Sequence, residues 1–139
     1  MKISEAKAKE LASQALKARE NSYCPYSDFA VGAALLCAAG SVYTGCNIET
    51  AAFNGCCAER TAIFTAAAQG KREFTAIAVA GAGRGNEPNS FCTPCGVCRQ
   101  VMREFCRPDF DIILTDGKDI KAVTLDGLLP MAFGPDSLE

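Results

Sequence analysis

Apolar residues near the start of the chain recur at the spacing of an amphipathic helix. They fall on one stripe at i, i+3 and i+4 intervals, with charged residues on the other face. Ser4 stands where a helix cap is needed. The pattern predicts a helix over residues 4–20, followed by a turn-rich stretch over 21–28. The stripe holds Ala8, Leu11, Ala12, Ala15 and Leu16.

Two strand patterns follow this helix. Residues 29–37 (FAVGAALLC) and 41–46 (SVYTGC) are rich in apolar residues, and Ala38-Ala39-Gly40 between them fits a short hairpin connection. The small residues at 32–34 indicate that another element packs closely on the first strand. We therefore expect a β-hairpin covered by a helix.

The rest of the chain alternates between helix and strand patterns. The expected elements are a loop over 47–55, a helix over 57–69 ended by Gly70, a buried strand over 74–80, a loop over 81–90, a helix over 94–105, strands over 111–115 and 121–124, and a short helix over 125–131. This order predicts an α/β fold in which helices cover a mixed sheet of about five strands. No linker interrupts it, so we expect residues 1–139 to form a single domain.

Composition and charge narrow the choice of partners. No apolar run approaches the roughly 20 residues that a membrane helix needs. The net charge of −2 and pI of about 5.2 argue against a surface that neutralises nucleic-acid phosphates. The N-terminus lacks the apolar region of a secretory signal. We expect a cytoplasmic protein with no membrane or nucleic-acid partner.

Cysteine and histidine are the unusual components of the sequence. There are nine cysteines and no histidine. An odd number of cysteines in a chain without a signal argues against a disulfide framework. Since histidine is absent, a metal ligand or catalytic base must come from other residue types. The cysteines expected simply to pack in the interior are Cys24, Cys37, Cys46 and Cys106.

Three further cysteines have the positions expected of metal ligands. Thr93-Pro94 is a strong helix start, with Thr93 as cap, so Cys95 and Cys98 share one face of the first turns. Cys57 stands near another helix start, and the positive end of a helix favours a thiolate. Three thiolates with an open fourth position describe a catalytic zinc site.

Other uses of these thiols remain open on this reasoning. Cys56 or Cys92 as a fourth ligand would make a closed, structural zinc site. A C-x-x-C pair can instead serve as a redox dithiol. Glu59 favours the catalytic site, because a carboxylate two residues after a ligand can reach a zinc-activated water. Three thiolates leave one net negative charge on zinc, which Arg60 or Arg99 can offset by donating to sulfur.

The two cysteine motifs resemble those of the cytidine deaminase family, in its small homotetrameric class with three zinc-bound cysteines. The stretches that carry the resemblance are 57–61 (CAERT) and 94–100 (PCGVCRQ), and 24–35, 47–49 and 128–135 also resemble family motifs. The resemblance implies a three-layer α/β/α fold. It also implies hydrolytic deamination of cytidine and deoxycytidine to uridine and deoxyuridine in pyrimidine salvage.

The resemblance assigns a role to each site residue. It implies one zinc ion per chain, held by Cys57, Cys95 and Cys98, and a water activated by zinc that attacks C4 of the base. Glu59 transfers the protons, and Arg60 tempers the charge of the ligand sulfurs. The implied substrate contacts are Phe29 beside the base, the Ala58 backbone N–H at the base carbonyl, Asn47 and Glu49 at the ribose hydroxyls, and Phe133 at a neighbouring subunit's pocket.

Two departures from the family pattern concern the substrate. Phe53 stands where the family usually has tyrosine, and the loop from Asn47 to Cys57 is one residue shorter than the common pattern. A related enzyme, blasticidin S deaminase, has a still shorter loop, so a cytosine antibiotic is the alternative substrate. A non-catalytic zinc module, or a base editor of RNA or DNA, are further alternatives, although an editor needs a basic channel.

Overall fold

The computed structural model describes all residues from 1 to 139. The elements in chain order are α1 (Glu5–Ala18), η1 (Arg19–Asn21), β1 (Phe29–Cys37), β2 (Val42–Cys46), α2 (Ala58–Ala68), β3 (Phe74–Gly83), α3 (Gly96–Phe105), β4 (Asp111–Thr115), β5 (Ile120–Thr124), α4 (Leu125–Leu128) and η2 (Pro135–Leu138). Every strand expected from the sequence is present, and the connection between β1 and β2 turns through Gly40, whose φ is +101°.

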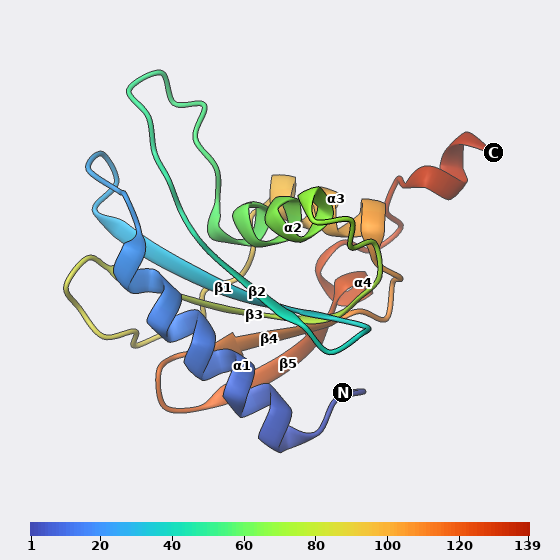
Figure 1. Cartoon of the computed structure of the whole chain (residues 1–139), viewed down its shortest axis with the longest axis horizontal. Coiled ribbons are helices and arrows are strands. Elements are labelled where there is room, and N and C mark those ends of the chain that lie inside the picture. Colours follow the sequence, from blue (N-terminus) through green and yellow to red (C-terminus); the bar gives the residue numbers. More distant parts are fainter.

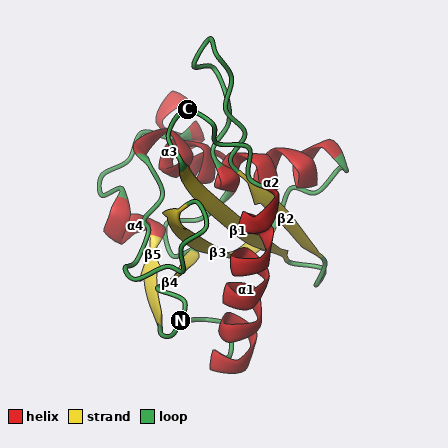
Figure 2. Cartoon of the chain, turned by 90° about the vertical axis from the view of Figure 1, so that its left-hand side faces the viewer, coloured by secondary structure: helices red, strands yellow, loops and turns green.

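The five strands form one mixed sheet in the order β2-β1-β3-β4-β5. Only the β3–β4 pair is parallel, because the chain crosses over through α3 between these strands. The helix α1 packs on one face, and α2 and α3 cover the other (Figures 1 and 2). The expected α/β fold with a five-stranded sheet between helical layers is therefore confirmed.

Successive side chains of the central strands point to opposite faces of the sheet, so the interior consists of two hydrophobic cores. Ala33 and Leu35 of β1 join the core beneath α2 and α3, whereas Ala34 and Leu36 join the core beneath α1. The α1 side is lined mainly by alanines, so the helix lies close to the sheet. A Cβ atom added at Gly32 would lie 2.0 Å from the Ala15 carbonyl oxygen, which confirms the expected close packing on β1.

Local signals located several helix ends correctly. The Ser4 side chain accepts a hydrogen bond from the Lys7 N–H at the start of α1, as expected of a cap. After α2, Gly70 has φ +85°, and its N–H donates to the Ala67 carbonyl. A glycine adopts this left-handed conformation without strain. The end of α2 is therefore fixed by local chemistry.

Three boundaries expected from the sequence are wrong. The helix α3 begins at Gly96 with Cys95 as its N-cap, so Thr93 does not cap it. The strand β3 continues to Gly83 because Gly81, Ala82 and Gly83 still pair with β1. The last helix, α4, ends at Leu128 rather than 131. The extension of β3 arises from its pairing with β1, a tertiary contact that local patterns do not contain. No helix combines the length and apolar character needed to cross a membrane.

Candidate metal centre and substrate cavity

Two helix starts meet at one point on the sheet. Cys57 is the N-cap of α2 and Cys95 is the N-cap of α3, both with extended backbone and with no hydrogen bond from the side chain to the helix. Their Sγ atoms lie 3.7 Å apart. Cys98 follows within the first turn of α3 and is fully buried. Folding therefore brings together three thiols from segments that are far apart in the sequence.

The three thiols fit a tetrahedral metal site. The Sγ atoms of Cys57, Cys95 and Cys98 all lie within 4.8 Å of one another. Zinc–sulfur bonds of about 2.3 Å at tetrahedral angles separate two sulfur ligands by about 3.8 Å. The Cys57–Cys95 distance matches this value. Neither Cys56 nor Cys92 belongs to the cluster, so a fourth position stays open.

The electrostatics of the cluster favour a bound cation. A hydrogen bond from Cys98, together with those from Arg60 and Cys95, lowers the pKa of Cys57 to about 5 against the opposing effect of burial. The same contact with Cys57, reinforced by burial, raises the pKa of Cys98. Without a cation these two neighbours share one negative charge. A divalent metal ion removes this restriction, because it deprotonates coordinating thiols outright.

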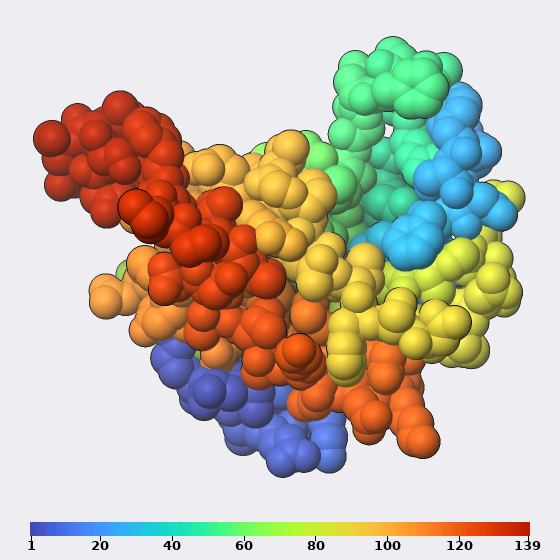
Figure 3. Space-filling model, turned by 180° about the vertical axis from the view of Figure 1, so that it is seen from behind, coloured from blue at the N-terminus to red at the C-terminus, as the bar shows by residue number.

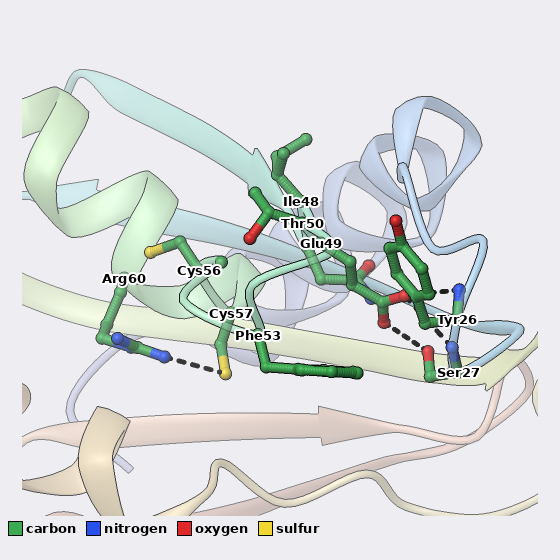
Figure 4. A pocket seen from close by; sticks show the side chains of 11 residues that line it. Tyr26, Ser27, Ile48, Glu49, Thr50, Phe53, Cys56, Cys57 and Arg60 are labelled. Carbon is green, nitrogen blue, oxygen red and sulfur yellow. Dashed lines mark hydrogen bonds between the residues drawn. The ribbon is translucent and has the colours of Figure 1, made fainter.

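Arg60 is the charged side chain next to these sulfurs. Its Nη2 donates to Cys57 Sγ at 3.3 Å, and the hydrogen bond to Cys57 raises the pKa of the guanidinium (Figure 4). Arg99 behaves differently: its Nε donates to the Pro94 carbonyl and its Nη1 to the Leu128 carbonyl. Of the two arginines considered in the sequence, only Arg60 donates to a ligand sulfur.

Glu59 is a buried carboxyl beside the cluster. It is the second residue of α2 and only 3% exposed. Burial raises the pKa of this carboxyl, and the charge on Cys57 acts in the same direction. A carboxyl kept away from bulk water, with a raised pKa, is suited to carrying a proton between reacting groups. The preceding residue, Ala58, opens the helix, where the first backbone N–H groups have no partner within the helix.

Phe29 and Cys92 lie together over Gly81, and the Cys92 thiol is close enough to Glu59 to be affected by its charge. A Cβ atom at Gly81 would lie 2.7 Å from Cys92 Sγ and 3.1 Å from Phe29 Cε1, so both side chains pack over this glycine. Burial raises the pKa of Cys92 to about 11, and the charge of Glu59 contributes. The Cys92 thiol is therefore a neutral neighbour of Glu59, a position that the sequence did not indicate.

A cavity of 420 Å³ runs from Cys57 to the loop after β2 (Figure 4). Its wall carries both residues expected to bind ribose, Asn47 and Glu49, as well as Phe53. Phe29, Ala58, Glu59 and Phe133 are not part of this wall. The remaining lining residues are Tyr26, Ser27, Ile48, Thr50, Gly55, Cys56, Cys57 and Arg60.

The polar side chains of this wall are fixed by the chain segment before and at the start of β1. Asn47 Oδ1 accepts from the Val31 N–H at 2.9 Å, and Asn47 Nδ2 donates to the Phe29 carbonyl at 2.8 Å. Glu49 Oε1 accepts from the N–H groups of Tyr26 and Ser27 at 3.0 and 3.1 Å. Both side chains are thus held in place before any ligand binds.

Backbone hydrogen bonds join the two sides of the loop between Asn47 and Cys57. Ile48 and Cys56 exchange two backbone hydrogen bonds, so the segment forms a finger that projects beside residues 22–28 (Figure 3). Gly55 is required there, since a Cβ atom would lie 2.2 Å from the Ile48 carbonyl oxygen. Near the tip, Phe53 is 84% exposed, and its ring centroid lies 5.9 Å from that of Tyr26.

Comparisons with known proteins identify the family of the chain. The sequence pattern of the family described as "Cytidine and deoxycytidylate deaminase zinc-binding region" matches residues 5–113. The chain belongs to this family. Cytidine deaminase of Sporosarcina psychrophila is 47% identical over 93% of both chains, and that of Halalkalibacterium halodurans is 45% identical over 92% of this chain and 95% of its own.

Solved structures of cytidine deaminases share the fold. The crystal structure from Burkholderia pseudomallei matches with a TM-score of 0.83 and 44% identity, over 94% of this chain and all of that one. The structure from Mycobacterium tuberculosis matches with a TM-score of 0.76 and 33% identity, over 91% and 96%. The protein is therefore a zinc-binding deaminase domain whose three-cysteine cluster can hold one zinc ion, as the sequence predicted.

Phe133 belongs neither to this chain's own cluster nor to the cavity wall. It is 61% exposed in the segment after α4, which projects from the body at the end of the molecule opposite the finger (Figures 1 and 3). Gln100 Nε2 donates to its carbonyl at 2.8 Å, and Arg103 pairs with Asp136 at 2.6 Å, so α3 holds the segment in place. Its expected role at a neighbouring subunit's pocket stays a prediction.

Sequence reasoning missed Tyr26 and Ser27. Two signals were present, a turn-rich stretch and the resemblance of residues 24–35 to a family motif, but neither shows which side chain the turn will meet. Their contact with Glu49 depends on how the loop after β2 returns past β1.

Proposed function

We propose that this protein is a cytidine deaminase, a hydrolase that converts cytidine and deoxycytidine to uridine and deoxyuridine with release of ammonia. The observation that carries the proposal is the three-cysteine cluster at two helix starts with a buried glutamate beside it. Membership of the deaminase family, and relatives named cytidine deaminase at 45–47% identity over nearly the whole chain, support the same reaction.

Cys57, Cys95 and Cys98 hold the metal in this proposal. When bound, zinc supplies a Lewis acid that makes water nucleophilic enough to attack C4 of the pyrimidine at neutral pH. Arg60 keeps the Cys57 sulfur in its thiolate form through the hydrogen bond to Sγ. The thiolate ligands and their counter-charge are then in place before substrate arrives.

Glu59 performs the proton transfers. Its carboxylate accepts a proton from the attacking water and delivers it to N3 of the base, then helps to protonate the departing amino group. The Ala58 backbone N–H donates to the base carbonyl, and Phe29 lies beside the ring. Burial of Glu59 supports this role, because a proton held there is not exchanged freely with bulk water.

Asn47 and Glu49 bind the ribose hydroxyls. Both line the cavity that leads to Cys57, and backbone contacts already fix their side chains. A site built to hydrogen-bond a hydroxyl discriminates strongly against analogues that lack it, because its polar groups would stay unpaired. This arrangement favours a nucleoside over blasticidin S, which has no ordinary ribose.

Ultraviolet absorbance tests the proposed function directly. The purified protein should convert cytidine and deoxycytidine, blasticidin S should be a poor substrate, and the same sample should contain about one zinc per chain. Cys98→Ser should lose zinc and turnover together. Cys46→Ser is the matched control, because Cys46 lies outside the cluster, and it should keep both.

Two results would contradict the proposal. A zinc-loaded protein that left cytidine and deoxycytidine unchanged would instead be a structural zinc module. Turnover of cytidine that excess single-stranded oligonucleotide suppressed would indicate base editing in a nucleic acid.

We further propose that the protein is a homotetramer in which Phe133 of one subunit closes the pocket of another. Large apolar side chains left exposed in the C-terminal segment, among them Met131 and Phe133, support association, since soluble monomers seldom expose large apolar patches. Light scattering measures the assembly. Mixing Glu59→Gln with Phe133→Ala chains should restore some turnover if pockets are shared. The most exposed large apolar side chains of the whole chain are Phe53, Met131, Phe133 and Leu138.

Residues 1–139 are best treated as one deaminase domain. Both cores rest on a single sheet, and the relatives match over more than nine-tenths of the chain. All nine cysteines are free, which suits the reducing conditions of the cytoplasm, the location that we propose.

A further inference from the structure

Ser27 contacts Glu49 through both its backbone and its side chain. Its N–H donates to Glu49 Oε1 at 3.1 Å, and its hydroxyl donates to Oε2 (Figure 4). The same hydroxyl oxygen accepts from the Phe29 N–H at 3.1 Å. One serine therefore connects the proposed sugar-binding carboxylate with the proposed base-stacking residue.

These contacts leave Glu49 with a defined direction for its ligand. An ionised carboxylate offers about four acceptor directions. The N–H groups of Tyr26 and Ser27 share Oε1, whereas Oε2 accepts only the Ser27 hydroxyl. A free acceptor direction thus remains on Oε2, and its orientation depends on Ser27. Because Glu49 lines the cavity, this direction is available to a ligand.

The turn that carries Ser27 is itself well defined. The Asp28 N–H donates to the Cys24 carbonyl at 3.0 Å, and Asp28 adopts φ +57°. Arg84 pairs with the Asp28 carboxylate at 2.8 Å. The backbone of the turn is thus held independently of Glu49. Removing the Ser27 hydroxyl should therefore leave the turn in place. Only the hydrogen bonds that this hydroxyl makes with the Glu49 carboxylate and the Phe29 N–H should be lost.

We propose that Ser27 is a positioning residue for substrate, whose hydroxyl orients the Glu49 carboxylate toward a ribose hydroxyl and aligns Glu49 with Phe29. The inference rests on the proposed function, because it concerns how the nucleoside is held. Ser27 does not touch the reacting atoms. It acts through Glu49, and its contribution belongs to substrate binding rather than to the chemical step.

Ser27→Ala and Ser27→Thr test the proposal in steady-state kinetics with cytidine. Loss of a hydrogen bond to a charged group should raise KM about tenfold in Ser27→Ala. The value of kcat should change less than about twofold, because a lost ground-state contact acts mainly on KM. Ser27→Thr keeps the hydroxyl and should restore KM. Ser22→Ala is the matched control, since the Ser22 hydroxyl donates to the Val31 carbonyl and does not contact Glu49.

Substrates and a double variant separate positioning from a general effect on the fold. With 2′,3′-dideoxycytidine, which lacks the 2′- and 3′-hydroxyls, Ser27→Ala should have little effect on KM if Glu49 binds one of these two groups. In a Glu49→Gln background Ser27→Ala should raise KM for cytidine much less than in the wild type, because both residues act on the same contact with the ribose hydroxyl. Thermal unfolding of each variant checks that the fold is intact.

Each outcome has a definite meaning. An unchanged KM in Ser27→Ala, or equal losses with cytidine and the dideoxy substrate, would overturn the role of Ser27 while leaving the deaminase function intact. A loss in kcat alone would also overturn it. Wild-type protein without turnover would refute the proposed function itself, and this result is read before any variant is compared.

Discussion

The metal end and the sugar end of the proposed site contain the same acidic residue type in opposite surroundings. Glu59, at the metal end, is buried in the first turn of α2, and burial raises its pKa. Glu49, at the sugar end, lies on a loop, and hydrogen bonds from Ser27 and Tyr26, led by the Ser27 hydroxyl, lower its pKa. One carboxyl is suited to exchange protons, and the other to stay ionised and accept hydrogen bonds.

The metal end and the sugar end of the proposed site also differ in the structural elements that support them. The metal end is built on two helix starts packed against the sheet, where three ligands and Glu59 have little freedom. The sugar end is built on a projecting finger whose contacts are mostly to backbone N–H and C=O groups. We therefore expect reaction type to be robust and substrate preference to depend on the finger.

Glu59→Gln should produce the largest loss. The amide keeps the size of the side chain but cannot carry a proton between water and substrate. We expect kcat to fall by about 10²–10⁴, with zinc content and thermal stability close to those of the wild type. Steady-state kinetics and metal analysis on one sample measure this. A variant with normal kcat would show that another group moves the protons.

The same substitution at the sugar end should act on binding. Glu49→Gln replaces one charged acceptor with an amide that also presents donors to the N–H groups of Tyr26 and Ser27. The loss of charge-assisted hydrogen bonds should raise KM about 10- to 100-fold while kcat stays within a few fold. If Glu49→Gln lowered kcat as much as Glu59→Gln does, the separation of the two ends would be wrong.

Substitution of Gly45 and Gly55 tests whether steric crowding at the metal end and at the sugar end has separate effects on kcat and KM. A Cβ atom at Gly45 would lie 2.5 Å from the Ala58 carbonyl oxygen, so Gly45→Ala should displace the start of α2 and lower kcat. Gly55→Ala should displace the finger and raise KM for cytidine. Each should cost about 1–3 kcal/mol of unfolding free energy, as overpacking does. Denaturant unfolding and kinetics of both variants measure these effects.

Gly32→Ala is the control for those glycine variants. It crowds α1 against β1, on the face of the sheet away from the cavity, where a Cβ atom would lie 2.0 Å from the Ala15 carbonyl oxygen. The stability of this variant should fall while KM and kcat stay near wild-type values. Equal kinetic losses at all three glycines would mean that crowding acts only through global stability.

The smallest effect concerns pH. The hydroxyl of Ser27 and the neighbouring N–H groups hold the pKa of Glu49 below its usual range, and Arg84 contributes. In the proposed role of Glu49 the ionised form binds the sugar, so affinity should be complete at neutral pH and should be lost as pH falls through that pKa. In Ser27→Ala the pKa of Glu49 should rise toward its ordinary value.

The measurement is the ratio of KM in Ser27→Ala to KM in wild type between pH 7 and 5. This ratio cancels the titration of the substrate itself, and it should increase by less than about twofold as pH falls. The other charged groups near Glu49 are Asp28, which pairs with Arg84, and Arg60, which lines the same cavity. A ratio that fell with pH would show that Ser27 does not support the ionised carboxylate.

Much of the fold follows from local patterns. The apolar stretch of β1, the Ser4 cap and the turn at Gly70 were all readable, because each depends on a few neighbouring residues. The start of α3 was not. Thr93-Pro94 is a good local signal, but Cys95 caps the helix in the structure. The position of that helix start is shared with the cluster at Cys57, and a local pattern does not include a residue 38 positions away.

Residue types and their short spacings already indicated the chemistry available to this protein. Without histidine, three cysteines and Glu59 at two helix patterns indicated a thiolate metal site, since residue types and short spacings fix donor atoms. Tertiary structure decided which thiols meet, that Arg60 rather than Arg99 donates to sulfur, and that Ser27 holds Glu49. Those contacts join segments distant in the chain, and only the packing of α2, α3 and the finger against one sheet sets their distances.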